Sequence, residues 1–448
     1  MRQTIRKQLS LVETGITHEH AFELKKIAEL ITNNPSIGQL IYGDLILGLR
    51  DAGTGRKGMM SGDQVFRAML IKQMNGFSYA QLAFHLADSR SYRCFCEFGF
   101  CDETPSESTL QRDFKKIQPA TLEKINGLIV KEAQVQKVED GKAVRVDCTV
   151  MKSNIHAPTD SSLLFDSVKV LCRWTQRAKE AFNIHVTDHT RRAKRRNIGI
   201  INAKKEGQRK KLYRDLLTVT QKAVKDAQRI LLSLILMGEH IIQAASISAQ
   251  LNHYLPQVEK VIDQATRRVI NGEQVPAAEK IVSIFEPHTD IIIKDRRDTY
   301  FGHKLTLTGG ASGLITDLVI EQGNPADSTL AARMIERQID IFGQAPRKAA
   351  FDGGFASKEN LKDIKVLGVV DVAFSKTRGL EISDMTTSER IFKRLRDFRA
   401  GIEGIISYLK RSFGMRCCNW RGFDSFQAYA WSSVVTANLL MLARHLIE

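Results

Sequence analysis

The stretch AVRVDCTVM, residues 143–151, decides the fold of the middle of this 448-residue chain. It follows the turn dipeptide Asp140-Gly141, is rich in β-branched residues and alternates in character, so it predicts a β-strand. Asp147 lies inside that strand, where a carboxylate costs free energy unless it meets a cation or hydrogen-bond donors. Asp147 is therefore the first candidate for a functional residue.

Further along the chain, strand and helix signals alternate. Asp327 stands directly before the first of the later helices, where an N-cap residue is expected. The order of these elements is typical of an α/β fold, and a helical insertion separates the first strand from the others. Strands are predicted at residues 290–295, 301–310, 314–324, 348–354 and 369–377, and helices at 328–343, 357–368 and 388–413.

Two more carboxylates stand out by their positions in this pattern. Asp352 follows the strand KAAF and precedes Gly353-Gly354, which places it at the carboxyl edge of a sheet, where open α/β folds put their sites. Glu403 borders the apolar stripe of the last long helix, which we expect to face the sheet. The stripe consists of Ile402, Ile406, Leu409 and Phe413.

Asp147, Asp352 and Glu403 would repel one another if two strands and a helix brought them together, unless divalent cations neutralised them. Hard oxygen ligands select Mg²⁺ or Mn²⁺. Two such ions about 3.5–4 Å apart can activate the attacking oxygen and stabilise the leaving oxygen of a phosphodiester. The alternative for each residue alone is a turn cap, an edge carboxylate or a helix ion pair, and spacing does not decide between these roles.

The charge of the chain favours a polyanionic partner. Lys and Arg number 66 against 50 Asp and Glu, a net charge of +16, and a basic surface gains affinity by releasing counterions from nucleic-acid phosphates. Residues 165–230 have a helical pattern and contain 18 Lys and Arg against 6 Asp and Glu. The densest run is a candidate DNA-binding surface, with a merely solvated face as the alternative. It contains Arg191, Arg192, Lys194, Arg195 and Arg196.

Residues 61–117 have the pattern of short helices joined by tight turns. Ser61, Ser78 and Ser106 stand where helix N-caps are expected. This arrangement is compatible with a helix-turn-helix that contacts DNA and equally with a helical packing domain. Periodicity does not separate these two interpretations.

Cysteine usage and the apolar segments indicate the compartment. Seven cysteines form a sparse, odd set, which favours reduced thiols in a cytoplasm. Residues 1–20 become polar where a secretory signal needs an apolar run. The apolar runs 230–237 and 428–442 are too short or too interrupted to span a bilayer. We therefore expect a cytoplasmic protein with no membrane partner.

The sequence around the three carboxylates resembles the DDE transposases of bacterial insertion sequences. The order of elements, with one Asp on the first strand, one after a later strand and a Glu on the last helix, is similar to their RNase H-like core. The N-terminal segment from residue 55 also resembles the helical domain that precedes such cores. The similar strings are VDCTVMKSNIHAPTDSSLLFDSVKVL around Asp147, AFDGGFAS around Asp352 and RAGIEGIISYLKRSFG around Glu403.

The third of these regions carries the most specific motif. In that family it often reads Tyr-x2-Arg-x3-Glu-x6-Lys. Arg399, Glu403 and Lys410 fit this spacing, while Arg396 stands in the place of the Tyr. The departure leaves open whether the reaction passes through a DNA hairpin.

The resemblance implies a DNA transposase that cleaves at the transposon ends and transfers the freed strand into target DNA. Asp147, Asp352 and Glu403 would be catalytic and would hold two Mg²⁺ ions, for which Mn²⁺ can substitute. Arg399 and Lys410 would contact DNA phosphates. The partners implied are double-stranded terminal inverted repeats and target DNA, bound by a homodimer in association with a bacterial nucleoid.

Two alternatives stay open at this point. One is an RNase H-like nuclease without strand transfer, and the other is a catalytically silent DNA-binding protein. The sequence does not give the terminal repeat, the target-site preference or the choice between cut-and-paste and copying routes.

The spacing of the carboxylates places the insertion. Asp352 follows Asp147 by 205 positions, whereas Glu403 follows Asp352 by only 51, so the extra mass lies after the first strand. We expect an α/β protein whose RNase H-like core, a mixed sheet flanked by helices, is interrupted by a basic helical insertion. The expected parts are a helical N-terminal domain (1–140), the core (141–164 and 286–425), the insertion (165–285) and a C-terminal helix (426–448).

Overall fold

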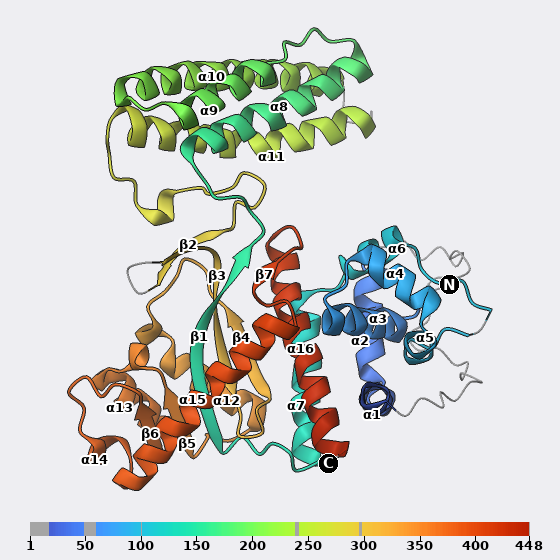
Figure 1. Cartoon of the computed structure of the whole chain (residues 1–448), viewed down its shortest axis with the longest axis vertical. Coiled ribbons are helices and arrows are strands. Elements are labelled where there is room, and N and C mark those ends of the chain that lie inside the picture. Colours follow the sequence, from blue (N-terminus) through green and yellow to red (C-terminus); the bar gives the residue numbers. More distant parts are fainter. Residues whose placement is uncertain (1–17, 49–59, 100, 238–241, 295–297, 448) are drawn as a thin grey trace. The chain divides into compact units, whose positions relative to one another are not determined.

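The computed structural model describes residues 18–48, 60–99, 101–237, 242–294 and 298–447 (Figure 1). The chain divides into two units, one formed by residues 1–152 and 303–448 and the other by residues 153–302. Residues 1–17, where we predict no signal peptide, and residues 55–59, where the family resemblance begins, lie outside the described residues. The predicted mixed α/β architecture with a helical N-terminal region is confirmed.

Seven helices come first among the described residues of the first unit, and the three N-caps predicted at residues 61–117 are confirmed. The side chains of Ser61 and Ser78 accept from the backbone N–H groups three residues later, and each forms a reciprocal capping box. Ser106 caps a third helix in the same way, through Thr109 N–H. These helices are α1 (Glu19–Asn33), α2 (Ser36–Ile46), α3 (Gly62–Asn75), α4 (Tyr79–Asp88), α5 (Arg90–Phe95), α6 (Glu107–Phe114) and α7 (Pro119–Val135).

A mixed sheet follows, and five of its described strands in this unit lie where the sequence predicts them. In this unit β3 pairs with β1 and, antiparallel, with β4, while β1, β5 and β6 run parallel. β7 adds a short pairing to β1 that the sequence did not predict. The strands are β1 (Ala143–Ser153), β3 (Asp298–Gly309), β4 (Ile315–Ile320), β5 (Lys348–Phe351), β6 (Asp371–Phe374) and β7 (Cys417–Cys418).

Five further helices of this unit belong to two hydrophobic clusters. One cluster joins β1, β5 and β6 to the helices of residues 331–342, 358–366, 382–385 and 389–412, through residues such as Phe351, Phe374 and Leu395. The other joins β3 and β4 to the N-terminal helices and the last helix, through residues such as Leu305 and Phe426. The helices are α12 (Ala331–Phe342), α13 (Lys358–Val366), α14 (Ile382–Met385), α15 (Glu389–Ser412) and α16 (Phe423–Ile447).

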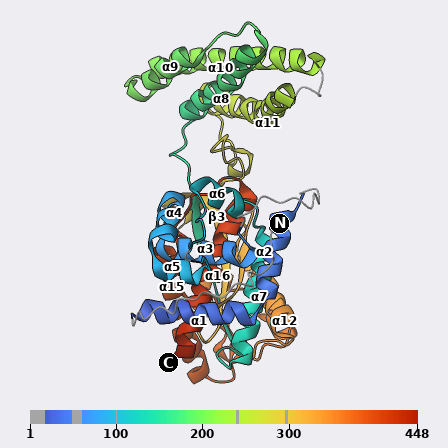
Figure 2. The same cartoon turned by 90° about the vertical axis from the view of Figure 1, so that its right-hand side faces the viewer.

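Helix α16 is buried along most of its length because it packs against α1, α3 and α7 as well as against β4 (Figures 1 and 2). Its Asn438 donates to Asn126 Oδ1 on α7 at 2.7 Å and accepts from the backbone N–H of Ile315 on β4 at 2.9 Å. Both asparagines are buried. The N-terminal helices and the sheet therefore share one core through α16.

In the second unit, the four α-helices within the described ranges form a bundle with its own hydrophobic core. Helix α8 packs against α9, α10 and α11, and the buried side chains include Leu171, Leu216, Ile230 and Leu251 (Figure 1). The strand β2 (Asp290–Lys294) pairs antiparallel with residues 298–302. The helices are α8 (Asp160–Phe182), α9 (Thr190–Asn202), α10 (Glu206–Met237) and α11 (Ile242–Ala265). None of the helices within the described ranges combines the length and the apolar character that a membrane-spanning segment requires.

A lysine lies in the core of the first unit. Lys72, on the buried helix α3, is 4% exposed, and its Nζ lies 5.0 Å from the ring centroid of Tyr79. Burial lowers the pKa of Lys72 from 10.5 to about 8, because a charged ammonium loses its hydration there. The core therefore carries a charge that an apolar side chain could replace.

We expect the Lys72→Met substitution to raise the free energy of unfolding by on the order of 1–3 kcal/mol at pH 7. Below about pH 8 both the folded and the unfolded chain hold the proton of Lys72, so the penalty is present in full. It disappears as the pH rises from about 8 to 10.5, since the folded chain releases the proton first. Urea unfolding at pH 7.5 and 9.5 should show the advantage of the variant shrinking at the higher pH.

The matched control is Lys131→Met, at an exposed lysine of α7. Its free energy of unfolding should follow that of the wild-type protein at both pH values. An advantage of Lys72→Met that did not change between the two pH values would contradict a charged, buried Lys72.

Candidate active site

The register of β1 and β5 brings the two candidate aspartates together. These strands run parallel with Val146 opposite Phe351, so Asp147, in the middle of β1, lies beside Asp352, the residue that directly follows β5. The side chain of Asp147 is 14% exposed, and its Oδ1 accepts from the backbone N–H of Cys148 at 2.7 Å. The strand pairing thus brings Asp147 beside Asp352, which follows the carboxyl end of β5 as the sequence predicts.

Asp352 is held by the next strand as well. Ser375 directly follows β6, whose Phe374 pairs with Phe351, and its Oγ donates to Asp352 Oδ1 at 2.9 Å. Burial alone would raise the pKa of Asp352, but the bond from Ser375, the N–H of Gly353 and the charge of Arg399 together lower it below its ordinary value. Asp352 is therefore ionised throughout the neutral range.

The two glycines after Asp352 leave space for neighbouring side chains. A Cβ on Gly353 would lie 2.8 Å from Lys376 Cβ, and one on Gly354 would lie 2.7 Å from Asp327 Oδ2. Contacts this short do not occur in folded proteins. Gly353 is thus required by the packing of the loop that carries Asp352, whereas a side chain at position 354 would have to displace the carboxylate of Asp327.

Glu403 comes from α15, as predicted. The stripe Ile402, Ile406 and Leu409 is buried, and Glu403 lies at its border with 61% of its side chain exposed. Ser388 directly precedes this helix and caps it, since its Oγ accepts from Ile391 N–H. Helix α15 therefore presents Glu403 beside the sheet with its carboxylate accessible.

Arg399 contacts all three carboxylates. Its Nη2 lies 3.3 Å from Asp147 Oδ2 and 2.5 Å from Glu403 Oε1, and its Nη1 lies 3.5 Å from Asp352 Oδ1. The side chain is only 16% exposed, so these contacts are partly shielded from water. Three carboxylates and one guanidinium together carry a net charge of −2, which is the complement of a divalent cation.

The three carboxylates fit a hard divalent cation, provided that the guanidinium of Arg399 moves away. Carboxylate oxygens are the ligands that Mg²⁺ and Mn²⁺ prefer. In this structure three carboxylates contact the guanidinium of Arg399, so they lie around a single positive charge. However, no group of three or more His, Cys, Asp and Glu side chains within the described ranges is arranged to hold a metal ion. The guanidinium of Arg399 would have to leave before a cation could take its place.

Lys410 lies on the same helix, seven residues after Glu403, and is half-buried. This separation corresponds to about two helical turns, so Lys410 lies on roughly the same side of α15. The helix thus carries Arg399, Glu403 and Lys410 in one row.

Asp327 does not have the role predicted from the sequence. The N-cap prediction is wrong, because helix α12 begins at Ala331 and a separate 3₁₀ turn spans Asp327–Thr329. Asp327 instead forms an ion pair with Lys304 Nζ at 2.9 Å, beside the loop of Asp352. A carboxylate before a helical pattern was not sufficient to identify a cap.

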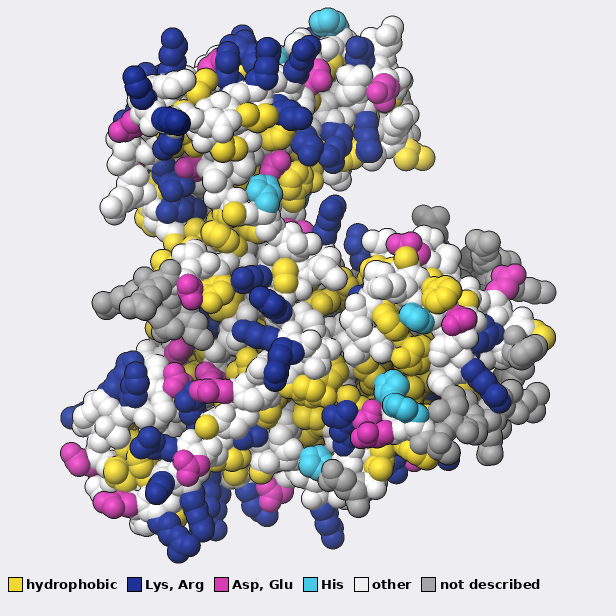
Figure 3. Space-filling model, in the orientation of Figure 1, with side chains coloured by type: hydrophobic (Ala, Val, Ile, Leu, Met, Phe, Trp, Pro, Cys, Tyr) yellow, Lys and Arg dark blue, Asp and Glu magenta, His cyan; other side chains and the backbone are white. Residues whose placement is uncertain are grey.

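The basic run of the second unit lies on α9, and its five cations divide into two groups. Arg192 and Arg196 both form ion pairs with Asp215 of α10. Arg191, Lys194 and Arg195 are exposed on the same helix. Figure 3 shows Lys and Arg side chains gathered over the helices of this unit.

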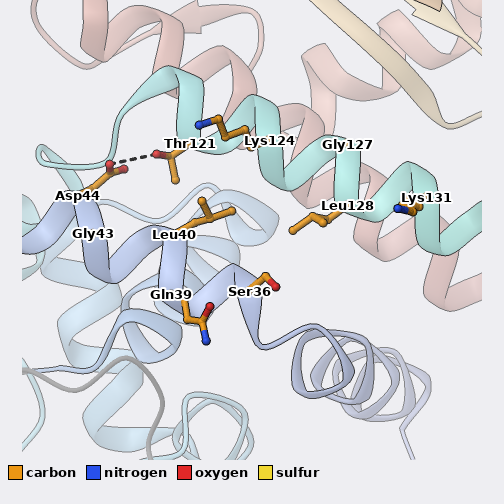
Figure 4. A pocket seen from close by; sticks show the side chains of 10 residues that line it. All are labelled: Ser36, Gln39, Leu40, Gly43, Asp44, Thr121, Lys124, Gly127, Leu128 and Lys131. Carbon is orange, nitrogen blue, oxygen red and sulfur yellow. Dashed lines mark hydrogen bonds between the residues drawn. The ribbon is translucent and has the colours of Figure 1, made fainter. Parts of the chain in front are cut away.

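A cleft of about 670 Å³ lies between α2 and α7 (Figure 4). Leu40 and Leu128 form part of its walls, Lys124 and Lys131 border it, and Thr121 donates to Asp44 Oδ1 at 3.0 Å within it. None of the candidate carboxylates lines this cleft. It is therefore separate from the candidate active site.

Comparison with known proteins gives two matching family models. The model described as "Transposase DDE domain" matches residues 292–439, which include Asp352, Arg399 and Glu403. The model described as "Transposase domain (DUF772)" matches residues 14–116, which include most of the N-terminal helices. No curated protein and no solved structure gave a significant match to the chain.

Proposed function

Because the chain belongs to the insertion-sequence transposases of the DDE type, with an RNase H-like core, we propose that it cleaves DNA at the ends of its element and joins them to target DNA. Asp147, Asp352 and Glu403 are the proposed catalytic residues. The observation that carries this assignment is that all three side chains reach the one guanidinium of Arg399. Scattered surface carboxylates would not converge in this way.

DDE transposases generally use divalent metal ions, and we propose that the three carboxylates hold two Mg²⁺ ions, which Mn²⁺ can replace. A divalent cation held there would activate the attacking oxygen and stabilise the leaving oxygen of a phosphodiester. The low pKa of Asp352 supports this role, since the side chain is a ready ligand at neutral pH.

Two in-line displacements make up the proposed reaction. In the first, water attacks the phosphodiester at the element end, and the 3′-oxygen leaves with a proton as a free hydroxyl. In the second, that hydroxyl attacks a phosphodiester of the target, the target's own 3′-oxygen leaves, and the number of phosphodiester bonds is conserved. Both steps require the protein to fix the reacting phosphate in line with the attacking oxygen.

Arg399 and Lys410 are the proposed phosphate contacts beside the carboxylates. A guanidinium binds carboxylate and phosphate with the same fork of N–H donors. Arg399 can therefore exchange its carboxylate partners for a phosphate oxygen when DNA enters the site. Lys410, further along the same helix, would contact the backbone of the same strand.

The N-terminal helices and the basic helix α9 are the proposed binding surfaces for the terminal inverted repeats. A homodimer would then hold two ends at once. On α9 the ion pairs with Asp215 divide the five predicted cations unequally. Arg191, Lys194 and Arg195 would bind phosphates more readily than Arg192 and Arg196, which share the carboxylate of Asp215.

Because only some of the α9 cations are ion-paired, we expect two matched double variants to differ in the salt dependence of their DNA binding. Arg191→Ala with Arg195→Ala should lower the slope of log Kd against log salt by about 1.8, as expected for two lost phosphate contacts. Arg192→Ala with Arg196→Ala removes the same number of charges at the same spacing but should change the slope far less. Fluorescence anisotropy with labelled end DNA over a series of salt concentrations measures both.

The opposite order of these two variants would contradict the assignment. Equal slopes for both variants and the wild-type protein would show that α9 does not bind DNA.

The test of the proposed function uses purified protein and labelled DNA that carries the ends of the element. In Mg²⁺ but not in EDTA, we expect new 3′ ends and products joined to target DNA. Cleavage without joined products would favour the nuclease alternative. Binding without cleavage in either Mg²⁺ or Mn²⁺ would leave a DNA-binding protein and refute the catalytic proposal.

A further inference from the structure

Arg145 is a buried cation of β1 that none of the roles above uses. It lies two residues before Asp147, on the same side of the strand, and is 8% exposed. Its Nη1 donates to the backbone carbonyl of Phe398 at 2.9 Å, and its guanidinium carbon lies 4.6 Å from the Phe398 ring centroid. Arg145 thus binds the turn of α15 that directly precedes Arg399.

Gly401 gives the guanidinium its space. A Cβ built on Gly401 would lie 2.1 Å from Arg145 Nη1, and a Cβ on Gly309 of β3 would lie 3.5 Å from Arg145 Nε. The guanidinium therefore fills the space between a glycine of α15 and a glycine of the sheet. Any side chain at position 401 would displace it.

We propose that Arg145 is a positioning residue that sets the place of α15 on the sheet and, with it, the places of Arg399 and Glu403. This inference rests on the proposed function, since it concerns the geometry of the same carboxylates. Arg145 holds α15 at Phe398 and Gly401, while Asp147, two residues further along β1, holds it at Arg399. Two adjacent points of one strand thus fix one turn of the helix.

Packing alone does not account for an arginine at this position. Its Nε is buried without a hydrogen-bond partner among the described residues. An apolar side chain of similar volume would avoid the cost of burying this charge. The arginine therefore serves the placement of α15 rather than the stability of the fold.

The first part of the test compares two glycines of α15. Gly401→Ala adds a methyl group where the guanidinium lies, whereas Gly404→Ala adds one that meets no atom within 4 Å. The displaced atom belongs to the flexible end of Arg145, so Gly401→Ala should fold but lose the contact with Phe398. We expect Gly401→Ala to cleave end DNA at least about tenfold more slowly at saturating DNA, and Gly404→Ala to cleave at the wild-type rate.

The second part removes the guanidinium itself. Arg145→Met should melt within a few degrees of the wild-type protein yet show the same loss of cleavage and a severalfold weaker binding of Mn²⁺ by calorimetry. Arg145→Lys, which keeps a donor for Phe398, should recover part of both. In the Arg145→Met background, Gly401→Ala should cause little further loss, because the methyl group then has space.

The possible results distinguish a failure of the role proposed for Arg145 from a failure of the proposed DNA cleavage. Wild-type rates and wild-type Mn²⁺ affinity in Arg145→Met, or equal losses in Gly401→Ala and Gly404→Ala, would overturn the role of Arg145. A wild-type protein that did not cleave under any metal would overturn the proposed function instead.

Discussion

An Asp352→Asn protein is expected to bind end DNA like the wild-type protein and to cleave and join it slower by a factor on the order of 10³ or more. Asparagine keeps the size of the side chain and can still accept the bond from Ser375 Oγ. It removes the negative charge, however, and an amide oxygen is a much weaker ligand for Mg²⁺ than a carboxylate. The loss should therefore lie in the chemical steps and not in DNA affinity.

The pH dependence of the loss of cleavage in Asp352→Asn is a second test of the charge on Asp352. Because the pKa of Asp352 is below its ordinary value, the wild-type side chain keeps its charge from weakly acidic to alkaline pH. The ratio of wild-type to Asp352→Asn cleavage rates should then be the same at pH 6.5 and pH 8.5. A ratio that fell toward one at the lower pH would show that Asp352 had taken up a proton.

The control for Asp352→Asn is Asp340→Asn, at an exposed aspartate of α12. It makes the same chemical change in the same unit and should leave cleavage and joining unchanged. Measurement requires labelled end DNA with Mg²⁺, with Mn²⁺ and with EDTA. Full activity of Asp352→Asn in Mg²⁺ would remove Asp352 from the catalytic set.

The elements that carry the candidate site could be predicted because each has a strong local signal. β1 follows a turn and alternates, β5 ends at Asp352-Gly353-Gly354, and α15 has a capping serine and an apolar stripe. The parallel pairing of β1 and β5 brings Asp147 and Asp352 together. Local pattern and sheet geometry were sufficient for this part of the site.

The partners of these residues could not be predicted, because they depend on contacts between distant parts of the chain. Spacing places Arg399 on the face of Glu403, but it does not show that the same guanidinium reaches Asp147, 252 residues earlier. Ser375 was missed for the same reason, since only the register of β5 and β6 brings it to Asp352. The apolar pattern of α16 likewise gives no sign that its partners are α1, α3 and α7.

Arg145 shows a different limit of sequence reasoning. A lone arginine in a strand is usually interpreted as a residue at the solvent-exposed side, and its two glycine neighbours, Gly309 and Gly401, lie on other elements. A signal was available in the helix, where Gly401 and Gly404 lower the helix propensity close to Glu403, the proposed catalytic glutamate. A glycine that weakens a helix often marks close packing, and here that holds for Gly401 alone.

Arg399→Gln is expected to have opposite effects on metal binding and on DNA binding. Without DNA, the arginine neutralises part of the charge that a cation would meet. Its removal changes the local charge from −2 to −3, so Mn²⁺ should bind on the order of tenfold more tightly, after allowance for screening by water. Calorimetric titration of the DNA-free protein measures this gain.

The same variant should be less stable without metal and less active with DNA. Three carboxylates without their shared partner repel one another, so the melting temperature should fall in EDTA and recover in Mn²⁺. The phosphate contact proposed for Arg399 is also lost, so cleavage and joining should decline although the metal binds better. Arg396→Gln, at an exposed arginine three residues earlier on α15, is the matched control and should change neither property. Weaker Mn²⁺ binding in Arg399→Gln would mean that the guanidinium orders the carboxylates for the ion. Tighter binding would mean that the guanidinium occupies the site of the cation until the ion and the DNA bind.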